Sequence, residues 1–387
     1  MPVFDSGPWE FLGGADHLIS HFDYLNSSDR VEAARVRAVV EEMFGRYPAA
    51  AQEALRHRLR SIDDNTHLSA FFELTLHDIV LRAGCVVLAV EPDMPGSSRS
   101  PDFLVETAEG QRFYLEGTMA TGRSRSEEGA ERRLREALQV IDSVRSPDFF
   151  FDLRISGTPI APVSGRQIRR GLESWLQGLN YEQVRSVWEQ DTGAVPVFRY
   201  EQNGVEFRIS PVPRRSSRGN LQRTRAIGSR MLPALSVQPH EPIRSAIGGK
   251  ATRYGQLDAP YIVAVNAMSD YADADDAVNA VFGTPAVFVR QTADGYEDRL
   301  GRQEDGVWRG ASGPINTRVS AVLSTERLNA WSLGQRRARL ILNPWAARPL
   351  PISPLQVDVV DVHEERLREV SGLSLREILT LPEGWPE

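Results

Sequence analysis

Two carboxylates face each other across a predicted β-hairpin at residues 100–118. A loop, Ala108-Glu109-Gly110, separates two apolar runs, and a three-residue loop with glycine in the left-handed conformation is a common hairpin connection. Pairing through this loop places Asp102 opposite Glu116, and it turns Phe103, Val105, Phe113 and Leu115 to the other face. Like charges placed directly opposite each other destabilise a sheet, so a hard divalent cation is expected to offset the repulsion. The alternative is a solvated pair of acids at the end of a hairpin.

A single lysine stands out among the basic residues. The chain holds 45 Lys and Arg residues together, and Lys250 is the only lysine. Lysine is a compact charge with a tunable pKa, and arginine does not replace it where that property is needed. Lys250 is therefore a candidate for a chemical role, although its survival by drift is an equally open interpretation.

A run of arginines gives a second, electrostatic signal. Residues 207–240 contain no acidic side chain in a chain whose formal net charge is −7. This pattern is typical of contact with phosphate groups, and a flexible, solvated loop is the alternative. The seven arginines are Arg208, Arg214, Arg215, Arg218, Arg223, Arg225 and Arg230.

Composition places the chain among ordinary folded proteins. Apolar residues make up 41% and charged residues 25%, and no apolar run approaches the ~20 residues that span a bilayer. The N-terminal sequence lacks the pattern of a signal peptide, and the single Cys85 has no internal partner for a disulfide. We therefore expect no membrane contact and a reducing, cytoplasmic location.

The predicted elements alternate between helices and strands, which indicates an α/β fold. Residues 1–65 read as an N-terminal helical segment. Residues 66–159 read as the core, in the order helix (66–83), strand (85–90, expected to be buried), the hairpin, helix (126–144) and strand (148–155). Residues 160–239 read as an inserted side module with the arginine-rich loop, and residues 240–387 as the remainder of the core with a C-terminal extension.

This order, together with Pro101-Asp102 entering the second strand and Glu116 ending the third, resembles the PD-(D/E)XK nuclease superfamily. The resemblance implies a restriction-endonuclease-like αβββαβ core with a mixed sheet. It also implies that Asp102 and Glu116 bind Mg²⁺ or Mn²⁺ and that Glu73, on the first helix, assists. The phrases G-K-A-T-R-Y-G-Q-L-D-A-P-Y-I-V-A-V-N and T-R-V-S-A-V-L are similar to uncharacterised bacterial proteins of this nuclease-like type.

Thr118 departs from the superfamily pattern, because the family has a lysine two residues after the glutamate. Three explanations are open: Lys250 supplies the charge from a later helix, His77 or Arg123 substitutes, or the site binds nucleic acid without cutting it. The leading expectation is a metal-dependent endonuclease acting on DNA rather than RNA, in bacterial restriction or phage defence. The alternatives are an inactive nucleic-acid-binding or scaffold protein of the same fold and, more weakly, an interaction module. A homodimer and partner proteins of a defence system are compatible with the first expectation.

Overall fold

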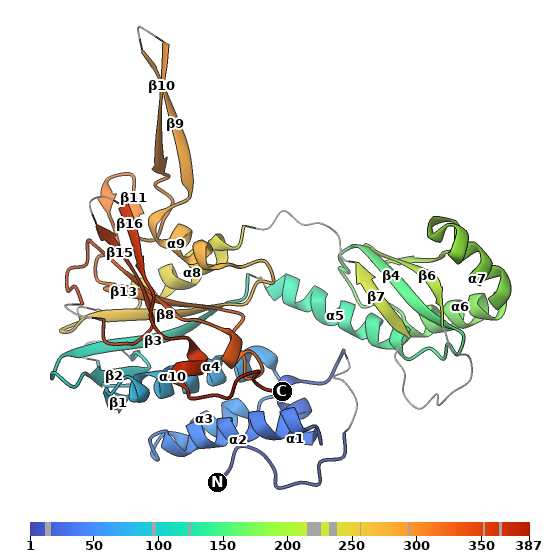
Figure 1. Cartoon of the computed structure of the whole chain (residues 1–387), viewed down its shortest axis with the longest axis horizontal. Coiled ribbons are helices and arrows are strands. Elements are labelled where there is room, and N and C mark those ends of the chain that lie inside the picture. Colours follow the sequence, from blue (N-terminus) through green and yellow to red (C-terminus); the bar gives the residue numbers. More distant parts are fainter. Residues whose placement is uncertain are drawn as a thin grey trace. The chain divides into compact units, whose positions relative to one another are not determined.

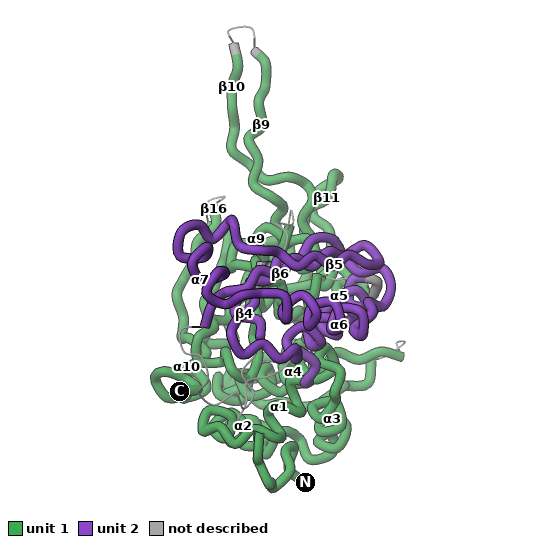
Figure 2. The backbone as a smooth tube through the Cα atoms, turned by 90° about the vertical axis from the view of Figure 1, so that its right-hand side faces the viewer, with its two compact units in different colours: residues 1–12, 20–122, 237–387 green, residues 13–19, 123–236 purple. Residues whose placement is uncertain are grey.

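The computed structural model divides the chain into two compact units (Figure 2). The first comprises residues 1–12, 20–122 and 237–387, and the second residues 13–19 and 123–236. The structure describes residues 1–11, 17–94, 98–122, 125–214, 226–231, 238–255, 257–292, 295–350, 353–363 and 366–387. Helices and mixed sheets occur together, so the predicted α/β class is confirmed.

The first unit is built on a sheet of eight described strands in the order β1-β2-β3-β8-β13-β14-β15-β16 (Figure 1). Strands β3, β8 and β13 run parallel to one another and form its centre, while β1 and β2 continue from β3 as antiparallel neighbours. The strand bounds are β1 Val86–Val90, β2 Phe103–Glu106, β3 Arg112–Ala120, β8 Tyr261–Ala267, β13 Ala321–Glu326, β14 Arg339–Leu342, β15 Asp358–His363 and β16 Arg366–Val370.

Helices cover both faces of this sheet. One apolar cluster joins the N-terminal helices to the face that carries Phe103 and Leu115, and a second joins α8 and α9 to the face that carries Tyr114 and Val263. The helices of the first face are α1 His21–Ser27, α2 Val31–Arg46, α3 Gln52–Leu59 and α4 Asp64–Arg82, with the short α10 Leu375–Ile378 also contributing. Those of the second face are α8 His240–Ala251 and α9 Ala274–Phe282. None of the described helices combines the length and apolar composition needed to cross a membrane.

The predicted hairpin and its register are confirmed. Leu104 pairs with Tyr114 and Glu106 with Arg112, the register that sets Asp102 opposite Glu116. Gly110 has a φ of 78°, the left-handed conformation that the three-residue loop requires. The four residues expected on the other face, Phe103, Val105, Phe113 and Leu115, are all buried. The apolar alternation therefore sufficed to determine which residues point toward α4.

The strand that lies beside the hairpin is β8, not the predicted strand at 148–155. That segment forms β4 (Phe149–Gly157), which belongs to a separate sheet in the second unit. The expectation that residues 126–155 belong to the core at 66–159 is therefore wrong, and α8 and β8 lie beside the hairpin instead. Every residue of β8 is buried, whereas β4 alternates. A continuous apolar run is typical of a central parallel strand buried on both faces, and alternation is typical of a sheet with one open face.

The second unit is a four-stranded sheet with helices packed on one side. Its strand order is β5-β6-β4-β7, and an apolar cluster joins α5 and α6 to the face that carries Phe151, Leu153 and Phe207. The unit begins at residue 123 rather than at the predicted 160. The remaining bounds are α5 Arg125–Asp142, α6 Gly165–Gln177, α7 Tyr181–Gln190, β5 Phe198–Gln202, β6 Val205–Pro213 and β7 Ile227–Met231.

Two features of the first unit are exposed to solvent. Strand β1 was predicted to be buried, but it forms one edge of the sheet, and Val86 and Leu88 are 58% and 42% exposed. A two-stranded ribbon, β9 Pro285–Thr292 and β10 Gly295–Arg302, projects from the body of this unit in both views (Figures 1 and 2). Two further short strands, β11 Arg309–Gly310 and β12 Gly313–Pro314, pair with each other.

Candidate functional site

The hairpin brings Asp102 and Glu116 together through the backbone as well as through their register. The Asp102 amide donates to Glu116 Oε2 at 3.1 Å, and the Gly117 amide donates to Asp102 Oδ2 at 2.6 Å. The Glu116 carboxylate thus accepts from the backbone of Asp102, and the Asp102 carboxylate accepts from the backbone of the residue that follows Glu116. These two bonds fix the orientation of both side chains, because each joins a carboxylate to a rigid strand backbone.

Lys250 reaches this pair from α8, although 134 residues separate it from Glu116 in the sequence. Its ammonium forms an ion pair with Glu116 Oε1. The buried stripe Ile243, Ile247 and Ala251 packs α8 against the sheet, and Lys250 lies three residues after Ile247 on the edge of that stripe. The Glu116 side chain is 3% exposed and that of Lys250 is 18% exposed, so this is a largely desolvated pair.

A second cation, Arg253, lies beside the same carboxylate and was not singled out from the sequence. Its guanidinium is 3.7 Å from Glu116 Oε1, and its side chain is 35% exposed. Arg253 follows α8 in a tight turn in which its amide donates to the Lys250 carbonyl. Tyr254, the next residue, donates its hydroxyl to the Ser100 carbonyl at 2.9 Å and ties this turn to the start of the hairpin. The spacing Lys250-x-x-Arg253 at a helix end was the available signal.

The electrostatics of Asp102 differ from those of an ordinary aspartate. Burial raises the pKa of the Asp102 carboxyl, and the negative charges of Glu116 and Glu73 raise it further. The hydrogen bond from the Gly117 amide and the charge of Lys250 act in the opposite direction but are smaller effects. Asp102 is therefore a carboxyl group whose ionisation needs additional positive charge nearby.

Glu73 is held by other residues of the helical layer. Both of its oxygens accept from Arg58, at 2.6 and 2.9 Å, and Oε1 also accepts from the Tyr47 hydroxyl at 2.7 Å. Glu73 is buried, and its charge contributes to the raised pKa of Asp102. Glu73 is thus a buried helix acid paired with an arginine. It influences Asp102 through its charge and not through a hydrogen bond.

His77 and Thr118, the auxiliary candidates that the structure describes, form no hydrogen bond or ion pair with Asp102 or Glu116. His77 is buried between the rings of Tyr47 and Phe103, and burial lowers its pKa to about 4, as expected of a packing residue. Thr118 is a half-buried residue of β3 that pairs with Val265 of β8. Arg123 lies outside the described residues. Of the three substitutes considered for the missing cation, Lys250 is the one that contacts Glu116 in the described chain.

The predicted arginine segment belongs to the second unit, except for its last residues. Arg208 is exposed on β6 and pairs with Glu206 at 2.9 Å. Arg214 is buried, lies 3.7 Å from the centre of the Phe150 ring and donates to the Phe149 carbonyl. It packs within the unit, so the expectation that it contacts phosphate is not supported. Arg230 lies on β7, and Arg215, Arg218, Arg223 and Arg225 fall outside the described residues.

The residues present fit a divalent cation only if other ligands complete its shell. No group of three or more His, Cys, Asp or Glu side chains is placed to hold a metal among the residues that the structure describes. Mg²⁺ is commonly bound through one or two carboxylates, with waters and substrate phosphates supplying the other oxygens. Asp102 and Glu116 match that type of donor set, whereas an all-protein cage does not fit.

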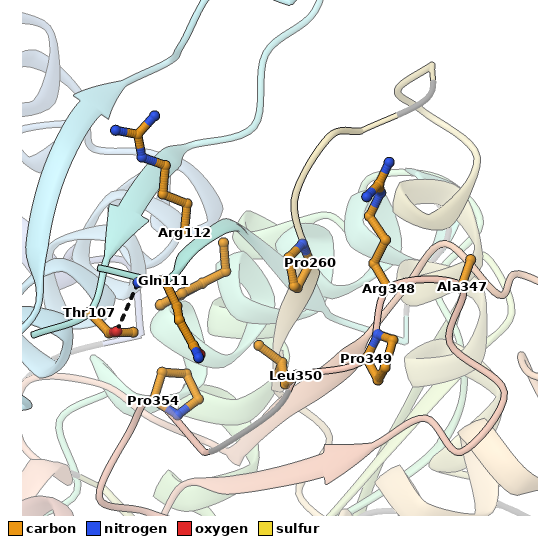
Figure 3. A pocket seen from close by; sticks show the side chains of 10 residues that line it. Thr107, Gln111, Arg112, Pro260, Ala347, Arg348, Pro349, Leu350 and Pro354 are labelled. Carbon is orange, nitrogen blue, oxygen red and sulfur yellow. Dashed lines mark hydrogen bonds between the residues drawn. The ribbon is translucent and has the colours of Figure 1, made fainter. Parts of the chain in front are cut away.

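A separate cavity of about 480 Å³ lies at the loop end of the hairpin (Figure 3). Its lining includes Thr107, Gln111 and Arg112 from the hairpin, together with Arg348 and the prolines Pro260, Pro349 and Pro354 from later segments. Asp102 and Glu116 do not line it, because Asp102 directly precedes β2, at the end away from the loop, and Glu116 lies opposite it in the middle of β3. This cavity is therefore distinct from the carboxylate pair.

Comparisons with known proteins leave the chain without an assigned family. No family model matches it, and neither the curated proteins nor the solved structures contain a match.

Proposed function

We propose that this protein is a Mg²⁺- or Mn²⁺-dependent nuclease that cleaves DNA, with a restriction-endonuclease-like core formed by α4, β1, β2, β3, α8 and β8. The observation that carries the proposal is the ion pair between Lys250 and Glu116, next to Asp102 in the opposing register. Two acids and a lysine converge from three elements and from distant parts of the chain. A bacterial restriction or phage-defence role is the setting we favour for such an enzyme.

In this proposal each residue has a separate task. Asp102 and Glu116 hold the divalent cation, which supplies Lewis-acid stabilisation of the phosphate and a water of lowered pKa. Lys250 orients the attacking water and adds positive charge next to the scissile phosphate. It replaces the cation that Thr118 cannot provide, since catalysis needs the charge in space rather than at one sequence position.

The proposal also accounts for the arrangement of charges without substrate. Lys250 and Arg253 lie on Glu116 Oε1 and partly neutralise the pair, while Asp102 has a raised pKa. A divalent cation must compete with these groups. A nucleic-acid phosphate favours metal binding, because it attracts the lysine and arginine and supplies further oxygen ligands. We therefore expect metal and DNA to bind with positive coupling, each raising the affinity for the other.

Cleavage of plasmid and linear DNA in Mg²⁺ or Mn²⁺ tests the proposal. Asp102→Asn, Glu116→Gln and Lys250→Met should each abolish cleavage. The matched control is Glu106→Gln in the same hairpin, where the acid pairs with Arg112 on the surface and should be dispensable. Absence of cleavage of any DNA or RNA by folded, metal-loaded protein would rule the enzyme out.

A non-catalytic nucleic-acid-binding protein is the second candidate, favoured by one observation. Glu73, the third acid of the expected set, is paired with Arg58 and Tyr47. If the protein binds DNA with a steep salt dependence but the metal-loaded form cuts nothing, this second function replaces the first.

A further inference from the structure

The ribbon formed by β9 and β10 carries apolar side chains into solvent. Its two strands pair through eight residue pairs, from Pro285 with Arg302 to Thr292 with Gly295. In the described chain neither strand pairs with a third one. The exposed fractions are 56% for Val287, 50% for Phe288, 64% for Val289, 76% for Tyr296 and 81% for Leu300. An isolated two-stranded hairpin is only marginally stable in water, whereas three or more strands support one another.

The base of the ribbon is anchored to the body of the first unit. Arg302 donates to Asn279 Oδ1 at 2.9 Å and to the Gly283 carbonyl at 2.7 Å, and the Gln303 amide donates to the Thr284 carbonyl at 2.8 Å. The ribbon then extends away from that body in two views at right angles (Figures 1 and 2). Its apolar side chains are thus held away from the body of the first unit, and the described residues of that unit do not cover them.

The two edges of the ribbon differ in charge. The middle of β10 reads Glu297-Asp298-Arg299, and charged side chains of this kind protect an edge strand from pairing. The middle of β9 reads Val287-Phe288-Val289, and Arg290 is the only charged residue of that strand. A strand with a single charge and several β-branched and aromatic residues is a template for a further strand.

We propose that β9 pairs antiparallel with β9 of a second copy of this chain, forming a four-stranded sheet in the order β10-β9-β9-β10. A register centred on Phe288 places Val287 opposite Val289 of the second copy and Arg290 opposite its Ala286. No like charges then face each other, and the central cross-strand pairs are apolar. The contact is two-fold symmetric and closes on itself, because both outer edges are then the charged β10 strands.

The proposed contact between the two β9 strands is small, so we expect it to be weak. Eight residues of one edge span about 27 Å. Such an edge contact is smaller than the ~800 Å² per partner that stable complexes usually bury. We therefore expect a reversible dimer whose population rises with protein concentration. The inference does not require the proposed nuclease activity, because it depends only on the ribbon.

Sedimentation of the full-length protein over a wide concentration range, combined with disulfide cross-linking, tests the inference. Val289→Lys should weaken dimerisation at least tenfold, while Leu88→Lys on the other exposed apolar edge, β1, should leave it unchanged. Phe288→Cys should give a covalent dimer on oxidation, because directly paired residues have Cα atoms about 4.5–5.5 Å apart, within disulfide range. Tyr296→Cys, on the outer strand of the same ribbon, should not.

Three results would overturn the inference. The first is a monomer at every concentration, which would leave the ribbon to a different partner. The second is a dimer that Leu88→Lys disrupts and Val289→Lys does not. The third is cross-linking through Tyr296→Cys in preference to Phe288→Cys. The native Cys85 is buried and is the only cysteine of the chain, so wild-type protein provides the background for the cross-linking assay.

Discussion

Lys250→Met removes the ammonium while keeping most of the aliphatic length, and it leaves the Glu116 carboxylate buried without its closest cation. Removing one partner of a buried ion pair typically costs about 3–5 kcal/mol. Glu116 keeps the Asp102 amide at 3.1 Å and Arg253 at 3.7 Å, so we expect the lower end of that range, about 3 kcal/mol. For a unit of this size the melting temperature should fall by roughly 6–12 °C.

The double variant Lys250→Met/Glu116→Gln provides the matched comparison. The amide oxygen of the glutamine still accepts from the Asp102 amide, and no buried charge remains at that position. The double variant should therefore be more stable than the sum of the single variants predicts, by about 2 kcal/mol.

Urea denaturation of the wild type, the two single variants and the double variant measures this double-mutant cycle. Hydrogen exchange of peptides from β3 and α8 assigns the loss of stability to the first unit. Mn²⁺ binding adds a readout that stability alone would not change. Lys250→Met removes a cation that competes with the metal for Glu116, so metal affinity should rise while DNA cleavage is lost. A cost below about 1 kcal/mol with no coupling in the cycle would refute the argument that this pair is buried and interdependent.

Three further predictions follow from the same site. Because the pKa of Asp102 is raised and a cation needs its ionised form, Mn²⁺ affinity measured by calorimetry should fall as the pH is lowered through that raised pKa; Asp102→Asn should bind weakly with a flat pH profile. A Cβ at position 117 would lie 3.2 Å from Asp102 Oδ2 and 3.2 Å from Leu76 Cδ1, so Gly117→Ala should cost roughly 1–3 kcal/mol in urea denaturation and weaken metal binding; unchanged stability and affinity would contradict this packing argument. If Arg253 contacts a phosphate, Arg253→Gln should reduce the slope of log K against log salt for DNA binding by about 0.9, whereas Arg244→Gln on the preceding helix α8, where the arginine is already bonded to the Asp305 carbonyl, should not change it.

Local patterns in the sequence were enough to predict the hairpin in detail. Alternation of apolar and polar residues placed Phe103 and Leu115 on the helix-covered face, and the glycine of a three-residue loop determined the register. Asp102 and Glu116 therefore became neighbours by short-range rules alone, because a strand has a side-chain period of two and a tight loop leaves no freedom to slip.

Rules of this kind did not identify the strand that packs beside the hairpin. The predicted order used the next helix and strand along the chain, and the second unit interrupts the core at that point. The distinction was present in the composition, since Tyr261–Ala267 is apolar apart from Asn266 and Phe149–Gly157 alternates from Phe151 onward. The predicted core instead followed the order of the elements along the chain, although an insertion can separate neighbouring strands at little thermodynamic cost.

The sequence by itself determined the facing acids and the uniqueness of Lys250, because both depend on residue identity and local spacing. Only the tertiary structure decided which cation meets which acid. Packing of α8 through Ile243 and Ile247 brings Lys250 onto Glu116 across 134 residues, and packing of α3 against α4 brings Arg58 onto Glu73. Such ion pairs depend on how helices dock on a sheet, and no local period in the sequence encodes that docking.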